Sequence, residues 1–187
     1  MNSKEIKYAD LTAGQYYHIY NRAIGNERLF FKSDNYSYFL RKYYFYLGEH
    51  LTTYAYCLMP NHFHILVKIN DDETHEVVSN QFRKLFLAYV TAINLQRKRK
   101  GGIFIKPFKR KLILDNQHLA VIVNYIHSNP VHHNLCSHPS MHAWNSYDQV
   151  VRNMNKKIFP NILSPFPLDK NVLETSFFKE NVLHEIE

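Results

Sequence analysis

Apolar and polar residues alternate in several short runs, and these runs mark the candidate strands of the chain. Successive side chains of a β-strand point to opposite faces, so alternation is typical of a strand with one buried face. The runs predict four strands, at Tyr16–Tyr20, Leu51–Leu58, His62–Ile69 and Lys109–Leu114. The turn residues Met59-Pro60-Asn61 separate the second run from the third, which predicts a β-hairpin.

Helical spacing of apolar residues predicts two helices between these strands. The first begins near Ser33 or Asp34, either of which can serve as the N-cap, and Gly48 fits its end. The second runs from about His75 to Lys98 and is followed by two glycines. Each helix carries one apolar stripe, so each is expected to pack on the sheet.

A third helix is predicted directly after the fourth strand. Asp115 can cap its start, and its apolar residues continue through Ser128. Pro130 predicts an end near Asn129, because proline disfavours the helical conformation in the residue before it. The order strand, helix, strand, strand, helix, strand, helix indicates an α+β fold, a ferredoxin-like antiparallel sheet with one added helix.

The third strand separates two chemically different faces. Its odd-numbered residues from Phe63 to Ile69 are apolar, whereas His62, His64, Leu66 and Lys68 share the opposite face. We expect the first two helices to cover the apolar face. The histidine face is then left for chemistry and for the last helix.

The length of 187 residues suffices for one domain with a buried core. We expect the functional domain to span residues 1–150, and an extension, residues 151–187, to pack on it or to be partly flexible. A short helix is predicted near Glu174–Glu187.

Charge and cysteine usage narrow the partner and the compartment. The formal net charge of +7 favours an anionic partner, most often nucleic acid. The two cysteines are far apart and lack metal or redox spacing, which indicates a reducing compartment. No apolar run reaches the length of a membrane span, and the first residues lack the apolar core of a signal peptide. We therefore expect a cytoplasmic protein without a membrane partner.

His62 and His64 flank one apolar residue, and on a strand their imidazoles share one face about 6.6 Å apart. Such a pair can converge on one metal ion. The alternative is two strand histidines with ordinary hydrogen bonds, and the motif alone does not exclude it. The position on the face opposite the core favours the metal site. His18, on the first strand, can lie near this site or be structural.

Tyr125 and Asn129 lie one helical turn apart and so share a face. Most of the 14 tyrosines must belong to the scaffold, but Tyr125 has this particular neighbour. The Asn129 amide offers an oxygen to a cation, and the Tyr125 hydroxyl offers a nucleophile. A free tyrosine has a pKa of about 10 and attacks poorly without help. A divalent ion held by Asn129 with His62 and His64 can act as a Lewis acid, and availability favours Mg²⁺ or Mn²⁺.

Eight basic residues and no acidic ones occupy fifteen positions near the end of the second predicted helix. They are Arg97, Lys98, Arg99, Lys100, Lys106, Lys109, Arg110 and Lys111. The interleaved Phe104 and Phe108 suit a groove that follows phosphates and stacks bases. The alternative is a solvated helix end. Arg22 can add to the same surface or be solvated. The histidine-rich stretch from His132 to His142 lacks tight metal spacing and favours a surface or capping role.

These motifs resemble those of the single-tyrosine transposases of the HUH endonuclease superfamily, and within it the REP-associated tyrosine transposases. The similarity covers about residues 14–150. It comprises Tyr17-His18-Ile19-Tyr20-Asn21-Arg22, Ala55-Tyr56-Cys57-Leu58-Met59-Pro60-Asn61-His62-Phe63-His64, Phe108-Lys109-Arg110, Tyr125-Ile126-His127-Ser128-Asn129-Pro130-Val131 and Trp144-Asn145-Ser146-Tyr147. The pairing of the histidine motif with the tyrosine motif at this separation is highly specific.

The resemblance implies an enzyme that nicks single-stranded DNA bearing imperfect hairpins, commonly repetitive extragenic palindromes. It implies that His62 and His64 bind the metal, that Asn129 is the third ligand and that Tyr125 is the nucleophile. Cleavage then leaves a free 3′-hydroxyl and a 5′-phosphotyrosine, and strands are rejoined without external energy.

The chain departs from the family after Val131, where the usual Arg-Ala-Gly is replaced by His132-His133-Asn134. Asn134 can take the left-handed conformation that a glycine would adopt. His132 in place of arginine weakens a phosphate contact, so the details of target recognition can differ.

The resulting hypothesis is a metal-dependent single-strand DNA endonuclease and strand-transferase, a monomer or homodimer without a small-molecule cofactor. One alternative is a catalytically silent hairpin-DNA-binding protein, against which the intact motifs argue. The other is a metallohydrolase of small phosphoesters, which the basic run and the lack of acidic ligands disfavour. We further expect Tyr125 to lie over the histidines of its own chain, with Oη within about 8 Å of the pair.

Overall fold

A computed structural model describes residues 8–151 of the chain. Its helices and strands follow the predicted order and end with a 3-10 turn and a short helix. They are β1 (Tyr16–Arg22), α2 (Ser33–Leu47), β2 (Leu51–Met59), β3 (His62–Ile69), α3 (His75–Gln96), β4 (Lys109–Ile113), α4 (Asn116–His132), η1 (Pro139–Met141) and α5 (Tyr147–Val151). All four predicted strands are confirmed. The helix predicted near Glu174–Glu187 lies outside the described residues.

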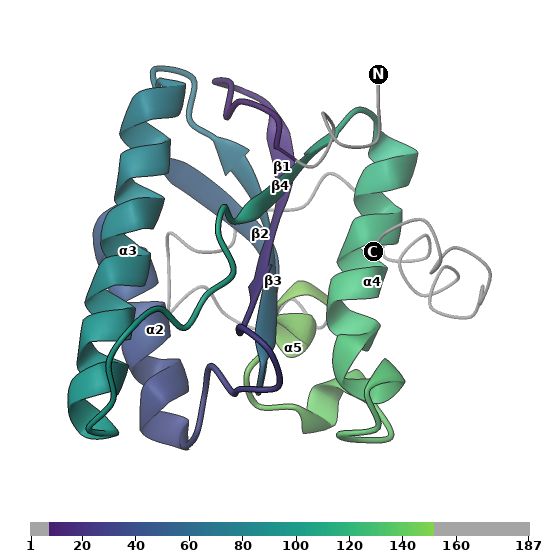
Figure 1. The fold of residues 1–187 in the computed structure, drawn as a ribbon. Coiled ribbons are helices and arrows are strands. Elements are labelled where there is room, and N and C mark those ends of the chain that lie inside the picture. The colour runs from purple at the N-terminus through teal and green to yellow at the C-terminus, as the bar shows by residue number, and fades with distance from the viewer. Residues whose placement is uncertain (1–7, 152–187) are drawn as a thin grey trace.

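The four strands form one antiparallel sheet in the order β2-β3-β1-β4. This is the ferredoxin-like arrangement that the sequence predicted. Helices α2 and α3 lie side by side on one face of the sheet, and α4 covers the other face (Figure 1). Among the described helices, none combines the length and the apolar character that crossing a membrane would require.

The two faces of β3 supply two separate cores. Phe63, Ile65 and their odd-numbered neighbours belong to the large core under α2 and α3. Leu66 belongs to a smaller core under α4, together with Ile122 and Ile126 of that helix. The predicted division of β3 into an apolar face and a histidine face is therefore confirmed.

Phe104 is buried in the core, so the prediction that its ring stacks on bases is wrong, whereas the partly buried Phe108 packs against the same core. Phe104 is only 4% exposed, and its ring centroid lies 4.9 Å from that of Phe86. The ring of Phe108 lies 5.0 Å from that of Phe82. Backbone hydrogen bonds between residues 22–24 and residues 103–105 hold this segment against the sheet. Sequence alternation did not reveal this long-range pairing.

Helix α2 begins at Ser33 with Lys32 in the N-cap position, so the prediction of Ser33 or Asp34 as the cap is wrong. The side chain of Asn35, inside the first turn, replaces the expected cap. Its Oδ1 accepts hydrogen bonds from the backbone N–H groups of Phe31 and Lys32, at 3.0 and 3.2 Å. An amide inside the helix thus satisfies donors that precede it.

Helix α4 continues to His132, so the predicted end near Asn129 is also wrong. Pro130 lies in the last turn and is buried there, and tertiary packing compensates for its missing N–H. Its carbonyl accepts a hydrogen bond from the N–H of Leu135 at 2.8 Å, and Asn134 has a φ of 55°. These features form a Schellman motif. The left-handed conformation predicted for Asn134 is confirmed.

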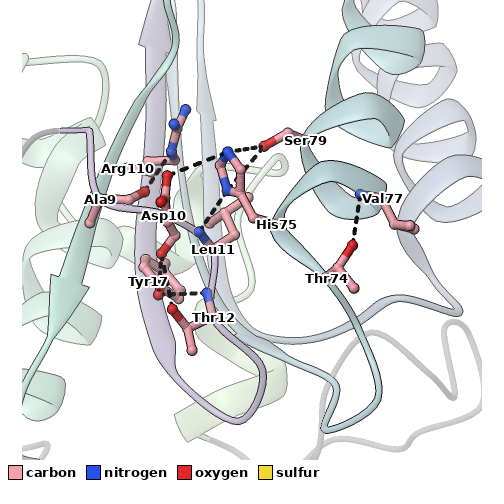
Figure 2. A network of polar contacts seen from close by, with 10 residues as sticks. All are labelled: Ala9, Asp10, Leu11, Thr12, Tyr17, Thr74, His75, Val77, Ser79 and Arg110. Carbon is pink, nitrogen blue, oxygen red and sulfur yellow. Dashed lines mark hydrogen bonds and ion pairs between the residues drawn. The ribbon is translucent and has the colours of Figure 1, made fainter.

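The segment before β1 is fastened to the edge of the sheet and to α3 (Figure 2). The hydroxyl of Tyr17 donates to the carbonyl of Asp10, and the N–H of Leu11 donates to Nδ1 of His75 at 2.9 Å. Arg110 Nε donates to the carbonyl of Ala9 at 2.6 Å. Arg110 therefore has a structural partner within the chain.

Candidate active site

Helix α4 carries Tyr125 to the histidine face of the sheet. Asp115 follows β4 after one residue and caps the helix, because its side chain accepts from the N–H of His118 at 2.7 Å. Tyr125 is only 7% exposed, and its ring meets that of His64 edge-to-face with centroids 5.2 Å apart. The ring of His18 lies 5.9 Å from it. One chain thus brings the tyrosine ring and the histidine face together.

Asn129, one turn after Tyr125, is oriented by that helix toward His62. Its Nδ2 donates to the backbone carbonyl of Tyr125 at 3.1 Å, so its Oδ1 is the atom that lies 3.0 Å from Nε2 of His62. The other ring nitrogen of His62, Nδ1, lies 2.7 Å from Oδ1 of Asn61. Both nitrogens of His62 therefore contact amide oxygens, which are acceptors.

This arrangement around His62 fits a bound cation. A neutral imidazole has one N–H, so it can donate to only one of the two amide oxygens. If Nδ1 donates to Asn61, the lone pairs of Nε2 and of Asn129 Oδ1 face one another. A second ring proton or a metal ion between these two atoms satisfies both.

The chemical types of the donor atoms are also suited to a metal ion. Within residues 8–151 no three His, Cys, Asp or Glu side chains gather as a metal site. The candidate set consists instead of His62, His64 and the amide oxygen of Asn129. Imidazole and carbonyl donors suit divalent cations of hard or borderline character. The residues present therefore fit such an ion.

His64 contacts a second histidine, His18, through its Nδ1 atom. Nε2 of His18 lies 2.9 Å from Nδ1 of His64, and the two rings stack with centroids 5.1 Å apart. Burial lowers the pKa of His18 to about 3, with a smaller effect from Lys111. Burial, assisted by the surrounding imidazoles, also lowers the pKa of His64 well below its ordinary value. Both rings are therefore neutral at pH 7.

Strand β4 divides the basic residues between the two faces of the sheet. Lys109 and Lys111 pair with Tyr20 and His18 of β1, respectively, and so lie on the histidine face. Lys109 Nζ lies 5.4 Å from the centroid of the Tyr20 ring. Arg110 pairs with Ile19 and so lies on the opposite face, where it donates to the carbonyl of Ala9. Only the two lysines of β4 are therefore beside the candidate site.

The rest of the predicted basic run is spread along the loop after α3. Arg97 stacks on the ring of Phe31, with Cζ 3.9 Å from the centroid, and Arg99 forms an ion pair with Glu27. These two arginines have partners within the chain. The lysines of the loop are exposed, namely Lys98, Lys100 and Lys106.

Two further side chains lie beside His62. Arg22 is paired with His62 across β1 and β3 and is exposed. The ring of His133, just after α4, lies with its centroid 4.9 Å from that of His62. Sequence spacing offered no signal for the second contact, because it depends on where the end of α4 meets the hairpin.

His127 and Ser146 clamp the middle of α4 to β2. Nε2 of His127 lies 2.8 Å from Oγ of Ser146, and that oxygen accepts from the backbone N–H of Tyr56 at 2.8 Å. Both side chains are fully buried. Because His127 is two residues from Tyr125, this clamp fixes the helix where the tyrosine meets the histidine face.

The clamp predicts acid sensitivity of the fold. Burial lowers the pKa of His127 from 6.5 to about 3. Between these two pH values the unfolded chain therefore binds a proton that the folded chain does not bind. The free energy of unfolding should be constant above pH 6.5 with respect to this group and fall as pH decreases toward 3. The contribution is at most about 1.4 kcal/mol per pH unit. Denaturant unfolding at several pH values should show a shallower fall for His127→Gln, and equal slopes would contradict the prediction.

Three comparisons with known proteins bear on this site. No protein-family model matches the chain. A Haemophilus influenzae protein, named as a candidate REP-associated tyrosine transposase, is 27% identical over 115 residues. The match covers 58% of this chain and 64% of that protein, so the chain spans less than two thirds of this relative. A solved structure of a REP-associated tyrosine transposase bound to a REP hairpin has a TM-score of 0.66 to this chain.

The chain resembles the REP-associated tyrosine transposases. The motifs had predicted this resemblance, and the match in sequence confirms it. The structural match, at 15% identity over 87% of this chain and 92% of the other, confirms the fold. The resemblance assigns roles to His62 and His64 of β3 and to Tyr125 and Asn129 of α4, and the structure brings these two elements together. The individual roles of those side chains stay predictions.

Proposed function

We propose that this protein is a metal-dependent single-strand DNA endonuclease and strand-transferase, a transposase that nicks hairpin-bearing DNA. The observation that carries the proposal is that one helix holds Tyr125 against His64 and Asn129 against His62. Nucleophile and candidate ligands therefore belong to one chain. This geometry supports a monomer that is competent to nick. The resemblance to REP-associated transposases supports the same chemistry.

The proposed cleavage is an exchange of phosphodiester bonds. The hydroxyl oxygen of Tyr125 attacks a backbone phosphorus, the hydroxyl proton leaves to solvent, and a phosphotyrosine bond forms. The bond from phosphorus to the 3′-oxygen breaks, and that oxygen takes up a proton as a free 3′-hydroxyl. A 3′-hydroxyl on another strand can reverse the step. No external energy is needed, because one phosphodiester replaces another.

His62, His64 and Asn129 would hold the divalent ion, Mg²⁺ or Mn²⁺ in the cell. When bound, it supplies Lewis-acid polarisation of a phosphate oxygen and a template for the scissile group. All three side chains are neutral as ligands, so they leave the positive charge of the site undiminished. That charge favours the approach of a DNA backbone.

The proposed DNA contacts use the basic side chains on the histidine face. Lys109 and Lys111 follow one edge of the site, and Arg22 lies beside His62. The REP hairpin bound to the solved relative supports hairpin DNA as the partner. Because Phe104 is buried, its ring is not available to stack on bases. We therefore base the proposed affinity for DNA on contacts with phosphates.

Detection of a covalent adduct tests the proposal. The protein is incubated with Mn²⁺ and a hairpin-bearing oligonucleotide from its own genomic neighbourhood, and products are analysed by denaturing gel and mass spectrometry. A protein carrying the 5′-phosphorylated fragment, together with a fragment ending in a 3′-hydroxyl, is expected. Hairpin binding without an adduct would favour the catalytically silent DNA-binding protein. Hydrolysis of small phosphoesters without an adduct would favour the metallohydrolase.

The position of the basic residues predicts which of them govern DNA affinity. Replacing Lys109 and Lys111 with glutamine should weaken hairpin binding and flatten its salt dependence, by about 0.7 to 0.9 in log–log slope for each phosphate that is no longer neutralised. Arg83→Gln with Lys84→Gln is the matched control, because it removes the same charge from α3 on the opposite face. Fluorescence anisotropy at several salt concentrations measures both slopes. Equal slopes for the two double variants would contradict the assignment of the DNA surface.

A further inference from the structure

His18 is a fully buried histidine whose ring nitrogens are used unequally. Nε2 lies 2.9 Å from Nδ1 of His64, whereas Nδ1 has no hydrogen-bond partner within the described residues. The ring also stacks on Tyr20, with centroids 4.7 Å apart. Burial of an unpaired ring nitrogen is unfavourable, so a buried histidine at this position needs a compensating role.

Two neutral tautomer pairs satisfy the bond between the histidines. In the first, Nδ1–H of His64 donates to Nε2 of His18, and Nε2 of His64 carries a lone pair. In the second, Nε2–H of His18 donates to Nδ1 of His64, and the ring proton of His64 is on its own Nε2. Since Nδ1 of His64 is occupied in both, Nε2 is its only nitrogen for a metal. Only the first pair can bind one.

We propose that His18 is a positioning residue for the metal site, which accepts the Nδ1–H of His64 and so keeps Nε2 of His64 open for a divalent cation. The inference rests on the proposed function, because that function requires the ion. Histidine ligands commonly donate their second N–H to a carboxylate, a carbonyl or water. Here the acceptor is a neutral imidazole. It orients the ligand without adding negative charge next to the DNA backbone.

The packing around His18 suits this role. The rings of Tyr20 and Tyr125 contact it from two directions, stacked and edge-to-face. These contacts restrict rotation of the His18 ring. The acceptor atom is therefore held at a fixed place relative to His64, and the strand pairing of β1 with β3 fixes the backbones.

Two variants separate the acceptor from the ring. His18→Phe keeps a ring that can stack on Tyr20 but removes the acceptor, and His18→Gln keeps an acceptor oxygen near the position of Nε2. Calorimetric titration of the DNA-free protein with Mn²⁺ measures affinity directly. His18→Phe should bind Mn²⁺ about 10- to 100-fold more weakly than the wild type. His18→Gln should retain most of the affinity, and thermal unfolding checks that both variants fold.

Equal Mn²⁺ affinity of His18→Phe and the wild type would overturn the inference and leave the proposed function standing. If the wild type binds Mn²⁺ but forms no adduct with DNA, the proposed function fails while the inference is still tested by the variants. A wild type that binds no Mn²⁺ overturns both.

A second measurement needs no variant. Long-range ¹H–¹⁵N spectra of the wild-type imidazoles, recorded with Mg²⁺, report which ring nitrogen carries the proton. The inference predicts a protonated Nδ1 in His64 and an unprotonated Nε2 in His18. The opposite assignment would overturn it, even if a substitution at His18 prevents folding.

Discussion

Replacing Tyr125 with phenylalanine is expected to abolish nicking and the covalent adduct while leaving hairpin affinity nearly unchanged. The substitution removes only the hydroxyl, and the phenyl ring can keep the edge-to-face contacts with His64 and His18. Loss of the nucleophilic atom should lower the rate of cleavage at least about a thousand-fold. Single-turnover assays with labelled oligonucleotide measure the rate, and gel-shift titration measures the affinity.

Tyr20→Phe is the matched control for this experiment. Its ring lies 5.7 Å from that of His64, on the same face of the sheet, so it is the tyrosine best placed to replace Tyr125. Tyr56 belongs to the core on the opposite face. Retained cleavage in Tyr20→Phe, with none in Tyr125→Phe, is the expected result. An adduct formed by Tyr125→Phe would assign the nucleophile elsewhere, first to Tyr20.

Removal of the metal, or of one imidazole that would hold it, should have an effect of similar size. EDTA should stop nicking by the wild type, and excess Mn²⁺ should restore it. His62→Ala should remove metal binding and nicking together, because one histidine and one amide are too few donors for a hard cation. Nicking rates measured across Mn²⁺ concentrations test both statements.

His62 is a better position for this test than His64. His64 is buried and bonded to His18, so its removal also leaves a cavity and an unpaired nitrogen. His62 is only partly buried. Unchanged hairpin affinity and an unchanged melting temperature would show that His62→Ala keeps the fold. Full nicking activity in EDTA would exclude the metal-dependent mechanism.

Local patterns were sufficient to predict the four strands, the three long helices and the faces of the sheet, but not η1 or α5. Alternation in β3 separated Phe63 and Ile65 from His62 and His64, because each residue's orientation follows from strand geometry alone. The helix ends were less predictable. Pro130 disfavours a helix locally, but burial of the last turn outweighs that preference.

The site was predictable where its residues lie close in sequence and not where distant segments meet. His62 with His64, and Tyr125 with Asn129, are short motifs whose spacing already implies a shared face. The bond between His18 and His64 depends on the register of β1 with β3. The contact of His127 with Ser146 depends on where the chain returns to β2. Neither partner can be inferred from spacing along the chain.

One residue, Leu114, separates β4 from the cap of α4, and this short connection bears on stoichiometry. A helix tied so closely to its own sheet cannot reach the site of a neighbouring molecule without unravelling β4. Under the proposed mechanism, each molecule would therefore hold one DNA 5′ end at a time. Mobilising a segment with two ends would take two molecules acting together, or one molecule that completes its first transfer before its second cut.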